Sequence, residues 1–457
     1  MLNKLRNNVS SLFREQPDPY AAYDASRYIA DKRYLCFAPF NNMYFNVHGE
    51  VAPCWLTLTG ADNIREKSIK EIWQGNRFRH IRQAIEKRDL SFACTTCEKN
   101  IRSGNHISSL SRLYDLDYPL SDFPVEMEFE LSNTCNLECV MCKGELSSTI
   151  RKNREQLPPL EVPYDENFVE QLTEFLPHLK EAKFLGGEPF LIPIYYKIWE
   201  KIIAVNPRIK ITVTTNGTVW NRRVERILQS LDFSIIMSID AFTRDTYHAI
   251  RIGSDFDKVI SNFERFRNYT RQKKTYMGIS VNPLRKNWKE LKAYVDFCNQ
   301  KDVFLWFNTI VYPFDEALWT WGARRLEEVY RVLSAQHPAD REAVCRKEVY
   351  HSNVTNYKNL VEVQIKNWWQ QAVQKEQQKT QYLKTLSPAE LREKLREQLL
   401  SYVYSDAYLP ASIKEQKALC VEEKINQLQS ESHTGELKKL FLLPETEAMQ
   451  IIANETL

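Results

Sequence analysis

The sequence of 457 residues predicts an α/β protein whose core is a partial barrel of parallel βαβ units. Amphipathic helical segments separate its strand-like segments, as Ile194, Ile198 and Ile202 illustrate with their spacing on one helix face. Polar motifs follow several strands directly, at the edge where α/β barrels keep their active sites. Six right-handed units predict a partial (β/α)6 barrel over residues 120–330. The predicted strands are residues 125–131, 182–185, 210–214, 233–239, 277–281 and 303–310.

Three cysteines follow the first predicted strand with the spacing C-x3-C-x2-C: Cys135, Cys139 and Cys142. Three thiolates can hold three irons of a cubane iron–sulfur cluster and leave the fourth iron without a protein ligand. An open iron can bind a small molecule, so the loop is predicted to be a reaction centre. Zinc is the alternative, although His178 is the one further Cys or His ligand up to Glu188.

Further motifs follow the later strands. Residues 184–190 contain a Gly-Gly-Glu-Pro sequence, in which glycine lets the backbone come close to a ligand; a turn ended by proline is the simpler interpretation. Residues 210–218 are predicted to be a strand that closes on a polar Thr-Asn-Gly-Thr turn. The next strand ends in Ser238 and Asp240, and Arg251 follows shortly after. A helix N-cap is an equally good interpretation of Asp240.

These motifs, in this order, resemble those of the radical SAM superfamily. The resemblance implies that Cys135, Cys139 and Cys142 hold a [4Fe–4S] cluster whose open iron binds S-adenosylmethionine. It implies that the Gly-Gly-Glu-Pro motif receives the amino group of this cofactor and that Ser238 and Arg251 hold its carboxylate. The implied cofactor-binding residues are Met141 (against the adenine), Gly186, Gly187, Glu188, Pro189, Thr215, Asn216, Ser238, Asp240 and Arg251.

A second cysteine set lies upstream, in residues 34–103. Its first two members have the pattern C-x12-G-x4-C, and its last two have the pattern C-x2-C. The set resembles a SPASM or twitch module, which implies one auxiliary [4Fe–4S] cluster; structural zinc is the alternative. The module precedes the barrel instead of following it, and it lacks the cysteines for a second auxiliary cluster. The implied ligands are Cys36, Cys54, Cys94 and Cys97.

The two ends of the chain have a different character. Residues 1–33 are predicted to be a leader segment, and residues 331–457 a helical extension that is poor in glycine. A capping box at residues 387–390 starts one helix of this extension, and Leu391, Leu395 and Leu399 form an apolar stripe on it. We expect the extension to pack on the barrel or on a second subunit; a substrate lid or a peptide-docking surface is the alternative.

Composition predicts a cytoplasmic protein. The polar N-terminus is unlike a signal peptide, no apolar run approaches a membrane span, and the clusters need a reducing compartment. A net charge of +3 without a basic stripe predicts no nucleic-acid partner, and the oligomeric state stays open. Cys298, Cys345 and Cys420 are expected to be buried free thiols.

The resemblance implies a reaction. A flavodoxin- or ferredoxin-like one-electron donor reduces the cluster, and S-adenosylmethionine is cleaved to methionine and a 5′-deoxyadenosyl radical that abstracts a substrate hydrogen. We expect oxidation of a peptide or small molecule, with the auxiliary cluster accepting the remaining electron. The alternatives are a redox-neutral epimerase or rearrangement enzyme, and a non-enzymatic scaffold or electron carrier. Trp306, Asn308 and Tyr312, near the sixth strand end, are candidates to line the substrate site.

Overall fold

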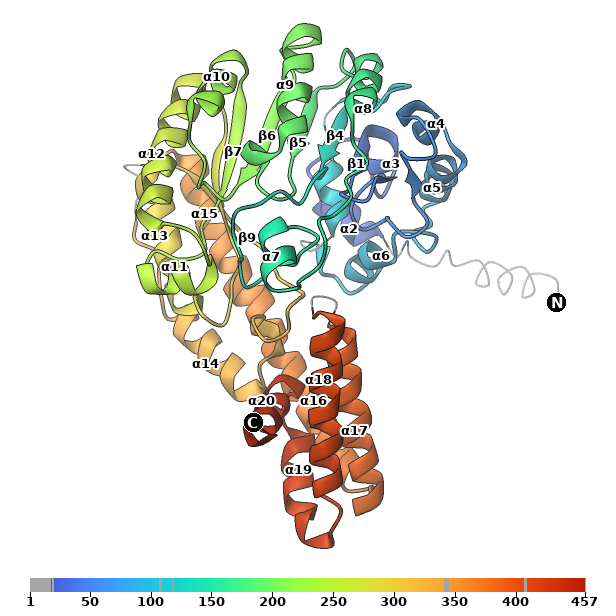
Figure 1. The fold of residues 1–457 in the computed structure, drawn as a ribbon, viewed down its shortest axis with the longest axis vertical. Coiled ribbons are helices and arrows are strands. Elements are labelled where there is room, and N and C mark those ends of the chain that lie inside the picture. The colour runs from blue at the N-terminus through green and yellow to red at the C-terminus, as the bar shows by residue number, and fades with distance from the viewer. Residues whose placement is uncertain are drawn as a thin grey trace, which may run out of the picture. The chain divides into compact units, whose positions relative to one another are not determined.

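A computed structural model describes residue 18 and residues 20–106, 109–116, 118–340, 345–406 and 409–456. Residues 1–17 and residue 19 of the predicted leader therefore lie outside the described residues. The chain forms two compact units, which Figure 1 shows with their helices and strands labelled. Unit 1 comprises Met1–Ser132, Glu161–Leu185 and Ile194–Ile211, and unit 2 comprises Asn133–Leu160, Gly186–Pro193 and Thr212–Leu457.

The strands of unit 1 join the cysteine-rich segment to the first barrel strands. Their order in the sheet is β3-β2-β1-β4-β5. The first three strands pair antiparallel, whereas β1-β4 and β4-β5 are parallel. The parallel pairing of β1 with β4 was not predicted. The bounds are β1 (Asn42–Phe45), β2 (Glu50–Ala52), β3 (Asp62–Asn63), β4 (Glu126–Phe129) and β5 (Glu181–Phe184).

Aromatic side chains form the core of unit 1. Phe129 of β4 stacks between Phe45 and Phe184, with ring centroids 5.5 and 5.0 Å apart. Trp199 contacts Phe184 from the predicted amphipathic helix α9, with 5.4 Å between the ring centroids. The helices that carry residues of this unit are α2 (Ala21–Ser26), α3 (Ala38–Asn41), α4 (Ile69–Trp73), α5 (Asn76–Glu86), α6 (Thr95–Arg102), η2 (Leu110–Tyr114), α8 (Glu166–Gln171), η3 (Leu172–Glu174) and α9 (Pro193–Val205).

Unit 2 continues the alternation of strands and helices. Strand β6 (Lys210–Thr215) has residues in both units, and β7 (Phe233–Ser238), β8 (Met277–Val281) and β9 (Phe304–Phe307) are parallel neighbours. The six predicted barrel strands are confirmed, but the last ends at residue 307 and not at 310. The helices are α7 (Ser148–Asn153), η4 (Pro189–Leu191), α10 (Arg222–Ser230), α11 (Arg244–Ile250), α12 (Phe256–Lys273), η5 (Trp288–Glu290), α13 (Leu291–Lys301), η6 (Leu318–Thr320) and α14 (Ala323–Ser334).

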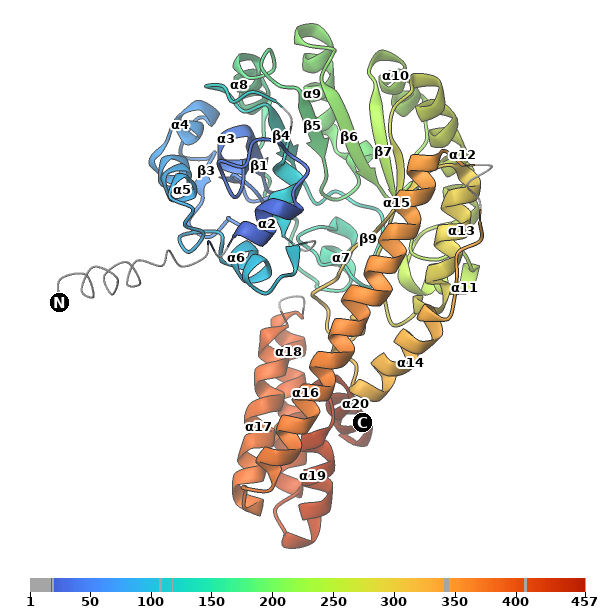
Figure 2. The same cartoon turned by 180° about the vertical axis from the view of Figure 1, so that it is seen from behind.

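The predicted helical extension is confirmed and has its own core. Figure 2 shows α15 (Lys347–Lys358) and α16 (Lys366–Leu383) as one long rod, which the π-helical η7 (Asn359–Ile365) connects. The predicted capping box forms at Ser387, and the leucine stripe of α17 (Pro388–Ser405) is buried in an apolar cluster. The later helices are α18 (Ala411–Gln427), η8 (Glu431–His433), α19 (Thr434–Leu442) and α20 (Glu445–Thr456).

The two remaining predictions about the whole chain concern membranes and thiols. Over the described ranges, no helix combines the length and the apolar character needed to cross a bilayer. All ten cysteines are free thiols, so none of them is withdrawn from a ligand role by a disulfide. Of the three predicted buried thiols, Cys298 and Cys345 are buried, whereas Cys420 is only partly buried.

Candidate functional site

The cysteine loop between β4 and α7 is held by hydrogen bonds to its backbone. The Cys135 amide donates to the Ser148 hydroxyl over 3.1 Å, and the Thr149 hydroxyl donates to the Cys135 carbonyl over 2.6 Å. Farther along, Arg154 donates to the carbonyl oxygens of Cys139 and Cys142 over 3.2 and 3.0 Å. These hydrogen bonds hold the main chain of the loop and do not use the three thiol groups.

Burial governs the protonation of the three thiols. It raises the pKa of Cys135 to about 11 and that of Cys142 to about 12, and the neighbouring cysteines add to both shifts. Burial also raises the pKa of Cys139, although Arg251 opposes it. A cysteine binds iron as the thiolate, so this site needs a cationic group to bring the thiols to their ligating form. The iron of a cluster supplies that charge.

The Gly-Gly-Glu-Pro turn lies against the cysteine loop so closely that a side chain cannot fit. A Cβ added to Gly187 would be 2.2 Å from the carbonyl oxygen of Thr134. The Glu188 amide donates to that same carbonyl over 2.8 Å. Gly186 has φ of +98°, which favours glycine. The two motifs that are far apart in sequence therefore form one wall of a site in unit 2, and Pro189 begins η4 directly behind it.

Glu188 is fully buried and makes three hydrogen bonds with its carboxylate. One oxygen accepts from the Thr215 hydroxyl over 2.8 Å and from the Phe190 amide over 3.1 Å, and the other accepts from the Asn216 amide over 2.8 Å. Burial raises the pKa of Glu188 to about 7, although the three donors oppose this shift. A carboxylate offers about four lone-pair positions, so one remains for a further donor. The carboxylate forms no ion pair with any residue in the described part of the chain.

The polar turn after β6 reaches the cysteine loop as well. The Asn216 side-chain amide donates to the side-chain oxygen of Asn136 over 3.2 Å and approaches the Cys135 sulfur at 3.8 Å. The Thr218 hydroxyl accepts from Asn136 over 3.1 Å. Of the two predicted cofactor residues on this turn, Asn216 lies beside both Cys135 and Glu188, and Thr215 lies beside Glu188.

Asp240 and Arg251 form a buried ion pair beside the same loop. Arg251 donates to one Asp240 oxygen through Nε over 2.6 Å and through Nη2 over 2.5 Å, and its Nη1 lies 3.6 Å from the Cys139 sulfur. Burial alone lowers the pKa of Arg251, but Asp240 and Cys139 outweigh it and the net shift is upward. The N-cap interpretation of Asp240 is wrong, because α11 begins at Arg244 and Thr243 occupies its N-cap position.

Two residues that the sequence analysis missed hold Asp240 in place. Asn282 donates to the second Asp240 oxygen through its amide over 2.7 Å, and Asn287 donates to the Asp240 carbonyl over 2.9 Å. Asn282 follows β8 directly, as Asp240 closely follows β7, so its position at a strand end was a usable signal. Nothing in the local sequence singles out Asn287 or Arg154.

Two of the three candidate substrate residues, Trp306 and Asn308, lie at the partly exposed face of the unit 2 sheet. Ser238, Ser280 and Trp306 are register partners across β7, β8 and β9, and Trp306 is 45% exposed. Asn308 donates to the Ser280 hydroxyl over 2.7 Å, which brings it to the same row. Tyr312 contacts Phe314 instead, with 4.9 Å between ring centroids, and Met141 is half-buried in the cysteine loop.

The second cysteine set lines a cavity in unit 1. Cys36, Cys54 and Cys97 are 7% exposed, and Cys94 is the N-cap residue of α6. Leu90 and Tyr114, which belong to a small apolar cluster, also line the cavity.

Burial and the neighbouring thiols raise the pKa of three of these cysteines, Cys36, Cys54 and Cys94. For Cys36, burial is the largest cause, and the charges of Cys94, Cys54 and Cys97 follow. Burial likewise raises the pKa of Cys54 to about 11 and that of Cys94 to about 12. This mutual repulsion is what a cationic iron–sulfur core removes. Across the described ranges, no three His, Cys, Asp or Glu side chains converge on a single-ion position.

The comparisons with known proteins match both cysteine sets. Residues 129–298 match the family model described as the Radical SAM superfamily. Residues 36–98 match SPASM, described as an iron-sulfur cluster-binding domain. The first match covers the cysteine loop and the motifs after it. The second match covers all four cysteines of the upstream set.

Similar proteins match shorter stretches. GTP 3′,8-cyclase of Clostridium botulinum is 24% identical over 170 residues, which are 37% of this chain and 49% of the relative. Probable GTP 3′,8-cyclase of Methanocella arvoryzae is 29% identical over 170 residues, which are 36% of this chain and 48% of the relative. The chain thus spans about half the length of these curated relatives.

Among solved structures, native anSMEcpe with bound AdoMet has a TM-score of 0.36 at 20% identity and covers 46% of this chain and 59% of its own. SuiB of Streptococcus suis bound to precursor peptide SuiA has a TM-score of 0.33 at 15% identity. The match covers 55% of this chain and 60% of the SuiB chain.

Proposed function

We propose that this chain cleaves S-adenosylmethionine and oxidises a peptide or small-molecule substrate. It belongs to the radical SAM superfamily and carries an N-terminal SPASM module. Its cofactors are S-adenosylmethionine and iron–sulfur clusters. One observation carries the proposal: Cys135, Cys139, Glu188, Asn216 and Arg251 come from separate segments yet meet within unit 2.

When bound to a [4Fe–4S] cluster, S-adenosylmethionine supplies a 5′-deoxyadenosyl radical that abstracts hydrogen from a substrate. Cys135, Cys139 and Cys142 are the three ligands that leave one iron open. Buried Glu188 supports this assignment, because its remaining acceptor position suits the cationic amino group of the cofactor.

The other cofactor residues are assigned to the remaining parts of S-adenosylmethionine. Arg251 keeps a positive charge beside the cluster loop and, with Ser238, binds the carboxylate, while Asp240 fixes the direction of the guanidinium. Asn216 and Thr215 are assigned to the ribose, and the half-buried Met141 is assigned to the adenine. Gly187 leaves room where a side chain would collide with the loop, and Gly186 adopts a positive φ that favours glycine.

The auxiliary module is assigned the role of electron acceptor. Cys36, Cys54, Cys94 and Cys97 can ligate all four irons of a second cubane, which leaves no iron open to coordinate substrate. Full ligation favours electron transfer, and hence a net oxidation, over substrate binding at this cluster. The first cluster needs an external one-electron donor of the flavodoxin or ferredoxin class, and the cytoplasm is the reducing setting that both clusters require.

Substrate contacts are assigned to the exposed row beside Ser238. Trp306 and Asn308 present an indole ring and an amide from this row, and Tyr312 follows a few residues later. An indole ring with adjacent amides suits a peptide backbone or a heteroaromatic small molecule.

The auxiliary assignment is tested by replacing Cys36, Cys54, Cys94 and Cys97 with alanine. We expect the reconstituted variant to hold about four irons where the wild type holds about eight, since each cubane contains four. Cleavage of S-adenosylmethionine should persist, whereas substrate product should not form because the substrate radical cannot lose its electron. Iron analysis and chromatography of 5′-deoxyadenosine and product make the measurement.

Other results would revise the assignment. Loss of one zinc with unchanged iron would establish a structural zinc site. Product formation in step with cofactor use, without the four cysteines, would favour a redox-neutral epimerisation or rearrangement.

A further inference from the structure

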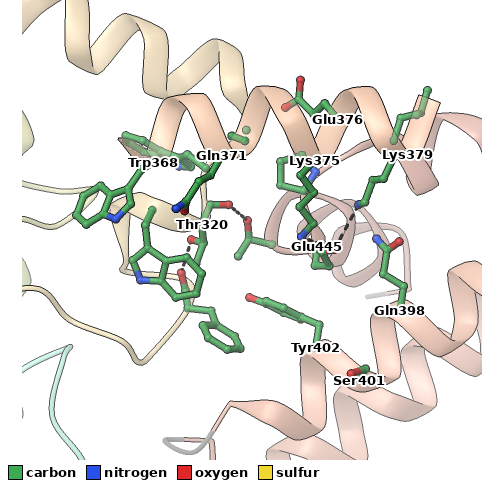
Figure 3. A pocket seen from close by; sticks show the side chains of 18 of the residues that line it. Thr320, Trp368, Gln371, Lys375, Glu376, Lys379, Gln398, Ser401, Tyr402 and Glu445 are labelled. Atoms are coloured by element: carbon green, nitrogen blue, oxygen red, sulfur yellow. Dashed lines mark hydrogen bonds and ion pairs between the residues drawn. The ribbon is translucent and has the colours of Figure 1, made fainter. Parts of the chain in front are cut away.

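A cavity of about 450 Å³ lies in the helical part of unit 2. Helix α16, the segment 314–322, the end of α17 and the junction of α19 with α20 line it (Figure 3). Its volume is in the range of about 300–1,000 Å³ that is typical of ligand sites. None of its lining residues is among those assigned to S-adenosylmethionine, to the clusters or to the substrate row.

Helix α16 turns one face to this cavity. Trp368, Gln371, Lys375 and Lys379 are three or four residues apart, so they lie along a single stripe of the helix. Although α16 has 18 residues, none of those in it is fully buried. The face of α16 that carries these four residues therefore borders the cavity.

The two ends of the cavity differ in chemistry. Trp368 marks one end in Figure 3. Trp319 and Trp321 of the segment 314–322 also line the cavity. Lys379 and Gln398 mark the other end. Residues 368 and 379 are separated by about 16 Å along the helix axis at 1.5 Å per residue. An occupant that reaches both ends therefore has the length of about five extended residues.

Two lysines and two glutamates line the cavity, and Lys379 also donates to the Leu443 carbonyl over 3.0 Å. Lys375 contacts both oxygens of Glu445 at 2.9 Å, and Lys379 shares the same carboxylate at 3.3 Å. Two ammonium groups thus share one carboxylate. The side-chain amide nitrogen of Gln398 is buried and has no hydrogen-bond partner in the described part of the chain. The other lining carboxylate, Glu376, already accepts from the Ala323 amide over 2.7 Å.

We propose that this cavity binds a peptide segment in which a large apolar side chain precedes an acidic residue by a few positions. The apolar side chain would enter among the indole rings, and the carboxylate would accept hydrogen bonds from Lys375, Lys379 and Gln398. The inference rests on the proposed function and narrows the substrate to a peptide. The cavity would hold one segment of this peptide while a different segment reacts. A five-residue span favours a peptide over a small aromatic acid.

Binding is tested by isothermal titration calorimetry with the full chain and synthetic peptides, without S-adenosylmethionine. The probe is acetyl-Phe-Gly-Ser-Asp-Glu-amide, and its two matched controls replace Asp-Glu with Asn-Gln, or Phe with Ala. We expect each control peptide to bind at least about tenfold more weakly, because charge-assisted hydrogen bonds and aromatic burial each contribute this much.

The protein is varied in matched pairs. Trp368→Ala and Lys375→Met should weaken binding of the probe at least about tenfold, by the same contributions. Trp369→Ala, whose ring stacks on Tyr330 outside the cavity, and Lys384→Met, at the end of α16, should leave it unchanged. Thermal unfolding of all four variants checks that the fold is intact.

Three results would overturn the inference. They are equal affinity for the three peptides, an equal loss of probe affinity in the control variants, and binding of phenylacetate as tight as that of the probe. Cleavage of S-adenosylmethionine should be unchanged in Trp368→Ala. Failure of peptide binding with intact cleavage would refute the peptide site alone, whereas intact binding without cleavage would refute the proposed function alone.

Discussion

Replacing Cys135, Cys139 and Cys142 together with alanine should abolish cleavage of S-adenosylmethionine. The reconstituted variant should retain about four of about eight irons, because the auxiliary cysteines keep their cubane. Production of 5′-deoxyadenosine should fall to the level seen without protein, since no open iron remains to bind the cofactor. Iron content, the absorption of the brown cluster and anaerobic product analysis measure these effects.

The chain provides a matched control for that experiment. Cys298, Cys345 and Cys420 are also three free thiols, and none of them belongs to either cysteine set. Their joint replacement with alanine should leave iron content and cofactor cleavage unchanged. Cleavage at the wild-type rate by the variant without Cys135, Cys139 and Cys142 would refute the assignment of the cluster.

Arg251→Met should destabilise the protein strongly and not merely weaken cofactor binding. Asp240 is fully buried and Arg251 is 8% exposed, so the substitution leaves a buried carboxylate without its cation. Breaking such a pair costs about 3–5 kcal/mol of unfolding free energy. The double variant Asp240→Asn with Arg251→Met should recover most of this loss, because neither charge is then stranded.

A double-mutant cycle, read as shifts of the thermal unfolding midpoint, measures the coupling. Arg244 and Asp257 form an exposed pair, with 59% and 63% of their side chains accessible, and Arg244→Met is the control. We expect a change of less than about 1 kcal/mol for this surface pair. Equal shifts for Arg251→Met and Arg244→Met would contradict the buried-pair account. The double variant should still bind S-adenosylmethionine weakly, which separates the two roles of Arg251.

The strands and the polar residues at their ends could be predicted because both leave local traces. Alternating residues in 125–131 indicated a strand, and the glycines of the next motif indicated close backbone contact; Gly187 indeed has no room for a Cβ. The capping box at Ser387 was equally local. Sequence spacing within one segment was enough for each.

Contacts between distant segments could not be predicted in this way. The pairing of β1 with β4 joins Asn42 to Glu126, and no periodicity in either segment specifies its partner. Asp240 was compatible with an N-cap until the fold placed Arg251 beside it. The cavity beside α16 was equally hidden, because a stripe of Trp, Gln and Lys has the composition of a solvated helix face.

Electron paramagnetic resonance of the reduced variant without Cys36, Cys54, Cys94 and Cys97 tests the central claim most directly. This variant contains the cluster of Cys135, Cys139 and Cys142 alone, so its spectrum is free of the auxiliary signal. If S-adenosylmethionine binds the open iron, its addition should shift the g values of the signal and change its shape. A spectrum that saturating S-adenosylmethionine leaves unchanged would contradict the account, since the cofactor would then not contact the cluster.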